Sequence, residues 1–261
     1  MKTFYDNFLN SNKEYIKISK NYNITVLGDK IEGFYIDDAY QLYRCPTHKK
    51  YEAELLLKLP LNYSFLDIGA HFGDTIITMA LYAKNNNRCD IRFFAFEPNN
   101  TKCKYIQKMN ELNNLNISVI NAGVGNKNCK IIPYHYRTTL KGTITYNELI
   151  NSNELINSYD TTDMITLNSI KDKIEPVGFM HIDVEGWEAL VLEGSADILS
   201  NNENKIFIIA ECWDNLISKR LGFSENPEKD ILNIMNNYKY SRQEDLIDQE
   251  KNLVFYQINY L

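Results

Sequence analysis

The sequence has no hydrophobic run long enough to cross a membrane. Its longest apolar stretches, such as residues 207–210, are far shorter than the roughly 18 residues that a spanning helix needs. Residues 1–12 are polar and lack the apolar centre of a secretory signal peptide. We therefore expect a cytoplasmic protein without membrane spans.

Cysteine is scarce and irregularly placed. The chain has five cysteines, an odd number with no C-x-x-C pair, at Cys45, Cys89, Cys103, Cys129 and Cys212. A disulfide framework or a structural zinc site requires a different spacing. The pattern is typical of reduced thiols in a cytosol-like compartment.

A surplus of positive charge is also missing. Acidic residues outnumber basic ones by 34 to 28, which gives a net charge of −6. A broad basic surface for nucleic-acid phosphates is therefore not expected. No segment repeats with a period of 20–50 residues, which excludes solenoids and propellers.

Apolar strand-like runs alternate with amphipathic helical segments along most of the chain. The expected strands are 63–68, 91–96, 117–121, 179–184, 205–212 and 252–258, and the expected helices are 51–59, 75–84, 100–113, 187–199 and 227–236. Strands that are apolar on both faces and alternate with helices indicate an α/β fold, with a mostly parallel sheet between two helical layers.

Two segments fall outside this alternation. Residues 13–45 contain short β-like runs around turn signals, so we expect a β-rich N-terminal extension over 1–50. The main domain then covers 51–261. It carries an insertion around 129–160, where extra strands over 129–146 precede a polar stretch over 147–160.

The first strand of the regular part ends in a glycine turn, Asp67-Ile-Gly-Ala-His-Phe-Gly-Asp-Thr75. Gly69 permits a tight turn and the close approach of a ligand to the backbone. Gly73 and Thr75 stand where the next helix begins, so their amide groups are expected to be free for a polar ligand. An ordinary strand-to-helix turn explains the same residues equally well.

The second strand ends at Glu97, 28 residues after Gly69 (97 − 69). An acidic residue at this distance is typical of a carboxylate that binds two ribose hydroxyls. A dinucleotide site would have a second glycine where His71 stands, because the pyrophosphate needs the space. This mismatch favours S-adenosylmethionine, whose ammonium group suits a carboxylate such as Asp67.

Acidic residues also follow two later strands. In an extended strand His181, Asp183 and Glu185 point to one side, where they could hold a divalent metal or act as a general base for a substrate hydroxyl. Alternatively, the strand ends at Asp183, and Glu185-Gly186 turns into the helix. Glu211 closes the most apolar strand, where it orients the substrate, pairs with a neighbour or is simply solvated. We expect no metal.

Taken together, these strand ends resemble the FkbM family of class I S-adenosylmethionine-dependent methyltransferases. The resemblance spans about residues 51–258. The matching segments are Asp67–Thr75, Phe94–Asn99, Ala122–Gly125, Ile165–Leu167, His181–Gly186, Trp187–Gly194 and Ile208–Glu211. The I-D-V-E-G block within His181–Gly186 is the most specific part.

The resemblance implies a Rossmann-like, seven-stranded sheet with an antiparallel last strand, and methylation of a hydroxyl on a sugar, glycan or related small molecule. It assigns the segment Asp67–Gly73, with Ala70 and His71, to the methionine part of S-adenosylmethionine. Glu97 is assigned to the ribose and Asn121-Ala122 to the adenine. By the same resemblance, Asp183 would lie near the transferred methyl group. We expect Asp183 to act as a base or an orienting group, with Glu185, His181 and Glu211 as helpers.

The sequence departs from the family pattern at three positions. His71 replaces an asparagine, His181 replaces a lysine, and Asn168 replaces an aspartate. Two alternatives therefore stay open beside the methyltransferase. One is a binding module that keeps the fold but has lost methyl transfer, and the other is an NAD-dependent oxidoreductase of nucleotide sugars.

Overall fold

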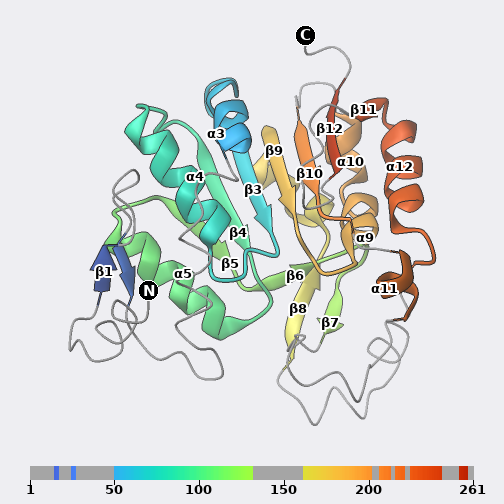
Figure 1. The fold of residues 1–261 in the computed structure, drawn as a ribbon, viewed down its shortest axis with the longest axis horizontal. Coiled ribbons are helices and arrows are strands. Elements are labelled where there is room, and N and C mark those ends of the chain that lie inside the picture. The colour runs from blue at the N-terminus through green and yellow to red at the C-terminus, as the bar shows by residue number, and fades with distance from the viewer. Residues whose placement is uncertain are drawn as a thin grey trace.

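The computed structural model describes residues 15–17, 25–27, 50–131, 161–201, 206–212, 215–220, 224–242 and 253–257. A seven-stranded sheet with the order β11-β12-β10-β9-β3-β4-β5 forms its centre (Figure 1). Its strands are β3 (Ser64–Ile68), β4 (Arg92–Phe96), β5 (Ile117–Ile120), β9 (Val177–Ile182), β10 (Phe207–Ala210), β11 (Tyr240–Arg242) and β12 (Leu253–Gln257).

Neighbouring strands from β5 across to β10 run parallel. β12 runs antiparallel to β10, and β11 runs antiparallel to β12. The predicted mostly parallel sheet with an antiparallel last strand is confirmed. The chain builds outward from β3 in one direction through β4 and β5, and then returns to the other side of β3 with β9 and β10. The strand order therefore reverses between β3 and β9, the place where open α/β sheets bind ligands beyond the carboxyl ends of their strands.

Helices cover both faces of this sheet (Figure 1). The described helices are α3 (Lys50–Leu57), α4 (Asp74–Asn85), α5 (Asn100–Leu112), α8 (Lys171–Ile174), α9 (Glu188–Glu193), α10 (Ala196–Ser200), α11 (Asn215–Arg220) and α12 (Pro227–Asn237), with a 3₁₀ turn η2 at Leu167–Ile170. No helix in these described ranges is both long and apolar enough to cross a membrane.

The apolar strands supply a separate core on each side of the sheet. Phe65 and Ile209 pack in the core under α3, α4 and α5, whereas Leu66 and Ile208 pack in the core under α9, α10 and α12. Alternate residues of one strand thus enter opposite cores, which is why these strands are apolar throughout.

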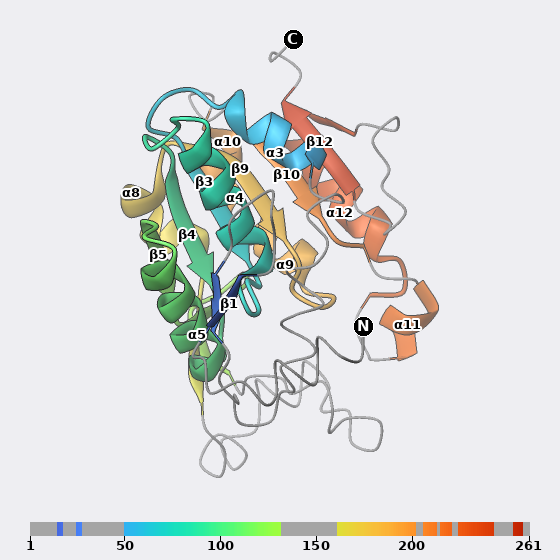
Figure 2. The same ribbon diagram turned by 60° about the vertical axis from the view of Figure 1, so that its left-hand side comes forward.

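Two smaller sheets lie outside the central one. β6 (Ala122–Val124), β8 (Thr162–Ile165) and β7 (Cys129–Ile131) form a three-stranded sheet in that order. β1 (Tyr15–Lys17) and β2 (Thr25–Leu27) pair antiparallel, as the β-like run over 24–27 predicts, and lie beside α5 (Figure 2). The remaining strands expected in 33–36 and beyond 131 fall outside the described residues.

The helix predicted over 187–199 is wrong as a single element. It breaks into α9 and α10 at Gly194-Ser195, where the backbone amide of Asn168 donates a 3.0 Å hydrogen bond to the Gly194 carbonyl. This bond holds η2 against the end of α9. The three-residue strands β6 and β11 were not predicted, since three residues are too few to show a period.

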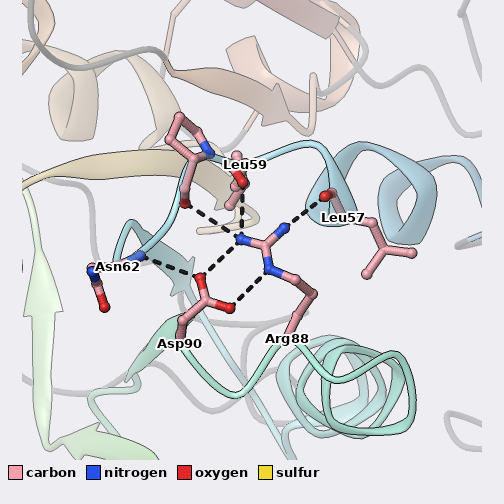
Figure 3. Close-up of polar contacts among 6 residues, drawn as sticks. Leu57, Leu59, Asn62, Arg88 and Asp90 are labelled. Carbon is pink, nitrogen blue, oxygen red and sulfur yellow. Dashed lines mark hydrogen bonds and ion pairs between the residues drawn. The ribbon is translucent and has the colours of Figure 1, made fainter.

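Arg88, which follows α4, binds the segment that leads from α3 into β3 (Figure 3). The Arg88 guanidinium donates from Nη1 to the Leu57 carbonyl at 2.6 Å and from Nη2 to the Leu59 carbonyl at 2.9 Å. Asp90 holds the guanidinium at 2.8 Å from Nε, and the Asn62 amide donates to the same carboxylate. Arg88 thus supplies donors to carbonyls at the end of α3, which the helix itself leaves without partners.

Replacing Arg88 with alanine is expected to lower the free energy of unfolding by about 2–3 kcal/mol, because half-buried carbonyls lose a charged donor. Replacing Lys108, whose exposed pair with Glu111 lies on the surface of α5, is expected to cost less than about 0.5 kcal/mol. Urea unfolding of the two alanine variants measures the difference. Equal losses would contradict the role assigned to Arg88.

Candidate functional site

The turn that follows β3 is shaped by its contact with the end of β9. Gly69 has φ +88°, and a Cβ on it would lie 1.8 Å from the carbonyl oxygen of Asp183. The amide of Asp183 in turn donates to the Ile68 carbonyl at 2.9 Å. Gly69 is therefore required by the protein's own backbone, whereas the sequence suggested that it makes room for a ligand.

The same turn meets the end of β4. The amides of Gly69 and Ala70 both donate to the Phe96 carbonyl, at 3.0 and 2.9 Å. The Glu97 carboxylate then accepts a 2.9 Å hydrogen bond from the His71 amide. Gly69 and Glu97, predicted to come together from positions 28 residues apart (97 − 69), are thus neighbours.

Glu97 is only 4% exposed. Its second oxygen accepts the Asn99 amide at 2.8 Å. Burial raises its pKa, and the nearby Lys102 ammonium opposes that rise. A carboxylate offers about four lone-pair sites, of which these two amides use two. Of the contacts among the described residues, these two amides leave two acceptor sites, the number that a pair of ribose hydroxyls needs.

His71 occupies the left-handed region with φ +50°, a conformation that His and Asn adopt more readily than most residues. Its ring packs edge-on against Phe72, with the centroids 4.5 Å apart. Burial, followed by the charge of Lys102, lowers the pKa of His71 to about 4. The imidazole is therefore neutral at physiological pH, and the contact of His71 with Glu97 comes from its backbone amide.

Asp67 belongs to β3, directly before this turn, and is 1% exposed. Its Oδ1 is 2.9 Å from His181 Nδ1, and its Oδ2 accepts the Ile76 amide at 3.1 Å. The Gly73 amide donates to the Ala70 carbonyl at 2.6 Å, so the prediction that this amide is free is wrong. Thr75 is buried in the first turn of α4.

Asn121 joins the end of β5 to the same edge. Its Nδ2 donates to the carbonyls of Glu97 and Pro98, each at 3.0 Å. Ala122 follows as a buried residue at the start of β6. Asn121 thus lies next to Glu97, with Ala122 after it in the chain, and the assignment of both residues to an adenine ring stays a prediction.

Two carboxyl groups meet at the ends of β9 and β10. The Glu211 amide donates to the Ile182 carbonyl at 2.9 Å, which places Glu211 beside Asp183. Burial first, and then the charge of Glu211 and a hydrogen bond between the two side chains, raise the pKa of Asp183 to about 8. Two carboxyl groups that hydrogen-bond to each other favour a proton between them, which agrees with the raised pKa of Asp183.

Glu185 does not continue the alternation predicted for His181 and Asp183. β9 ends at Ile182, and Glu185 and Gly186 have φ +58° and +98°, so the chain turns there. The prediction of three side chains on one side of an extended strand is wrong. The alternative, in which Glu185-Gly186 turns into the helix, is confirmed.

A residue without a predicted role closes this turn. Glu188 is buried, and its Oε1 accepts the amides of Val184 and Gly186 at 3.2 and 3.0 Å. Burial raises its pKa to about 7. The signal in the sequence was an acid two residues after the glycine of the turn, within reach of amides that the short turn leaves unpaired.

Lys102 is the second residue that the sequence analysis missed. It lies in the first turn of α5 with its Nζ 5.7 Å from the centre of the Phe72 ring. Burial lowers its pKa, while the charges of Glu97, Glu185 and Asp183 oppose that change. Its spacing four residues before the buried Ile106 was the available signal for an inward-facing side chain.

Glu185 also interacts electrostatically with this lysine. Although the residue is exposed, surrounding protein and then the Asp183 charge raise its pKa to about 7, against the effect of Lys102. Within the described part of the chain, no three His, Cys, Asp or Glu side chains are arranged to hold a metal ion.

Comparison with known proteins gives a family match. Residues 67–241, about two thirds of the chain, match the family model described as a methyltransferase FkbM domain. A search among curated proteins finds no match.

Solved structures of methyltransferases are similar at low identity. Methyltransferase FkbM from Methylobacillus flagellatus KT is 15% identical with a TM-score of 0.46, over 75% of this chain and 43% of that chain. M. capricolum TrmK, solved with S-adenosyl-homocysteine, is 13% identical with a TM-score of 0.36, over 80% of this chain and 69% of that chain. The chain thus spans less than half the length of the first of these.

The turn between β9 and α9 yields a prediction about stability and pH. Glu188→Ala is expected to lower the free energy of unfolding by about 1–3 kcal/mol, since two amides lose their acceptor. Glu188→Gln keeps an acceptor oxygen. In the folded protein the pKa of Glu188 is raised to about 7. The wild-type protein therefore loses stability as the pH rises from the lower pKa that Glu188 has in the unfolded chain through about 7.

Urea unfolding at pH 4.5 and pH 8 checks this prediction. The glutamine variant is expected to gain stability relative to the wild type between the two pH values. A relative loss at pH 8 would show that Glu188 is stabilised as a carboxylate and would contradict the assigned pKa.

Proposed function

Because the chain belongs to the FkbM methyltransferase family, we propose that it transfers a methyl group from S-adenosylmethionine to a hydroxyl of a sugar, glycan or related small molecule. S-adenosylmethionine is the cofactor of this family. The observation that carries the hydroxyl acceptor is the Asp183–Glu211 carboxyl pair, at the same sheet edge as Glu97. A hydroxyl needs a base to become a good nucleophile, and this pair of carboxyl groups can act as that base.

The residues around the β3 turn fit the adenosine part of the cofactor. Glu97 keeps two acceptor sites for the ribose hydroxyls after binding the amides of His71 and Asn99. The left-handed His71 bends the backbone around this carboxylate. Asn121 and Ala122, held beside Glu97, are the proposed wall of the adenine site.

When bound, the cofactor supplies a methyl group made electrophilic by a sulfonium. The protein then has two tasks, which are to place the acceptor oxygen in line with that methyl and to remove the hydroxyl proton. Asp183, ionised, would accept the proton that the acceptor hydroxyl loses when its oxygen takes the methyl group, and the carbon–sulfur bond of the sulfonium would break to leave a neutral thioether. Its raised pKa of about 8 makes it a stronger base than an ordinary aspartate.

Glu211 supports this step through its hydrogen bond to Asp183 and its charge. The Asp67 carboxylate holds His181 by Nδ1 at 2.9 Å and fixes the direction of its ring beside Asp183. His181 and Glu185 are the proposed helpers that orient the acceptor. The alternatives of a non-transferring binding module and an NAD-dependent oxidoreductase both predict no methyl transfer.

Asp183→Asn is expected to lower the rate of methyl transfer at least about 100-fold, the usual value of a general base, while cofactor affinity changes little. Asp172→Asn, an exposed change on α8, is the matched control. The measurement uses S-adenosylmethionine with a deuterated methyl group and a panel of sugars, oligosaccharides and glycolipids, with mass spectrometry of the products.

Methyl ethers formed by the wild type and the control, but not by the Asp183 variant, support the proposal. Cofactor binding with no transfer to any hydroxyl would favour the binding module. Binding of NAD but not of S-adenosylhomocysteine would favour the oxidoreductase.

The carboxyl pair also predicts a pH dependence. Transfer requires ionised Asp183, so the rate is expected to rise with pH as the pair loses its proton near pH 8. In Glu211→Gln the neighbour carries no charge, so the pKa of Asp183 falls and the rise moves to lower pH. Carbon-13 NMR titration of the side-chain carboxyls follows the same shift without an acceptor. An unchanged Asp183 midpoint in this variant would contradict the coupling.

A further inference from the structure

We propose that Lys102 sets the preference of this site between S-adenosylmethionine and its demethylated product, by placing a positive charge opposite the sulfonium. The inference rests on the proposed function, since it takes the cofactor to lie between Glu97 and Asp183. In this role Lys102 changes the electrostatic potential of the site and takes no part in proton transfer.

The position of Lys102 is set by the start of α5. Asn99 caps that helix, and its Oδ1 accepts the Lys102 amide at 3.1 Å. From there the side chain reaches across to the β3 turn, where Nζ lies 5.7 Å from the centre of the Phe72 ring. Phe72, which follows His71 in this turn, is fully buried. The ammonium is thus held between α5 and the turn that carries the proposed cofactor site.

Three carboxyl groups of the site lie close enough to this ammonium to act on its charge. Glu97, Glu185 and Asp183 each favour its charged form, against the burial that lowers its pKa. In return, Lys102 lowers the pKa of Glu97 and Glu185 and disfavours a charged His71. Its charge therefore acts at both the ribose end and the transfer end of the site.

The two forms of the cofactor differ in charge at one atom. S-adenosylmethionine has a sulfonium where S-adenosylhomocysteine has a neutral thioether, and the adenosine and amino acid parts are the same. A fixed ammonium nearby repels the first form and not the second. Its removal leaves the surrounding carboxylates unneutralised, which favours the sulfonium further.

The size of the effect follows from Coulomb's law. A fivefold change in relative affinity corresponds to about 1 kcal/mol, a size that the interaction of two unit charges in a partly solvated site readily reaches. The ratio of dissociation constants, Kd of S-adenosylhomocysteine over Kd of S-adenosylmethionine, is therefore expected to rise about three- to tenfold without Lys102. With Lys102 present, the product competes more strongly, so product inhibition is stronger.

Isothermal titration of the full chain with each of the two compounds at low salt tests the proposal. Lys102→Met and Lys102→Gln remove the charge, and Lys102→Arg keeps it. Lys104→Met removes a charge from an exposed position two residues further along α5. We expect the ratio to rise about three- to tenfold in the first two variants, and to stay within about twofold of the wild type in the other two.

Other results overturn the proposal. If the Met and Gln variants weaken both compounds equally, or bind neither, Lys102 contacts a part that the two share or supports the fold. An unchanged ratio in these variants, with both compounds bound by the wild type, refutes the role of Lys102 and leaves the proposed function intact. If the wild type binds neither compound, both the inference and the proposed function fail.

Discussion

The missing side chain at Gly69 is the constraint on which the site depends. It lets the end of β3 lie directly against the Asp183 carbonyl, where even a methyl group would overlap it. This contact sets the turn that directs the His71 amide at Glu97, and it holds Asp183 at the edge shared by β9 and β3. Without it, the proposed base and the proposed ribose carboxylate would not belong to one site.

The site is a collection of carboxyl groups held in places that disfavour their charges. Asp183, Glu185 and Glu188 all have raised pKa values, because the surrounding protein keeps water from their carboxyl groups, although Glu185 itself is partly open to solvent. Such groups cost folding stability and are concentrated where chemistry requires them. Anchors such as Arg88, remote from the chemistry, stabilise the sheet that holds these groups in position.

Much of this arrangement could be predicted from the sequence. Fully apolar strands alternating with helices predicted the sheet, and the positions of Gly69 and Glu97 at the ends of neighbouring parallel strands predicted their proximity. What failed depends on local turns and on side chains that act across the fold. The left-handed Glu185 ended the predicted alternation, and Lys102 reaches its neighbours only through packing of α5 against the turn. The turn at Glu185 leaves no periodic signal, and the helical spacing of Lys102 from Ile106 indicates only an inward-facing side chain, not its neighbours.

The central claim is that Glu97 and Asp183 stand at the two ends of one bound cofactor. A crystal structure of the chain with S-adenosylhomocysteine tests this most directly. The account predicts both ribose hydroxyls within hydrogen-bond distance of the Glu97 carboxylate and the sulfur atom on the side facing Asp183. A ribose bound elsewhere, with Glu97 still contacting only the amides of His71 and Asn99, would contradict it.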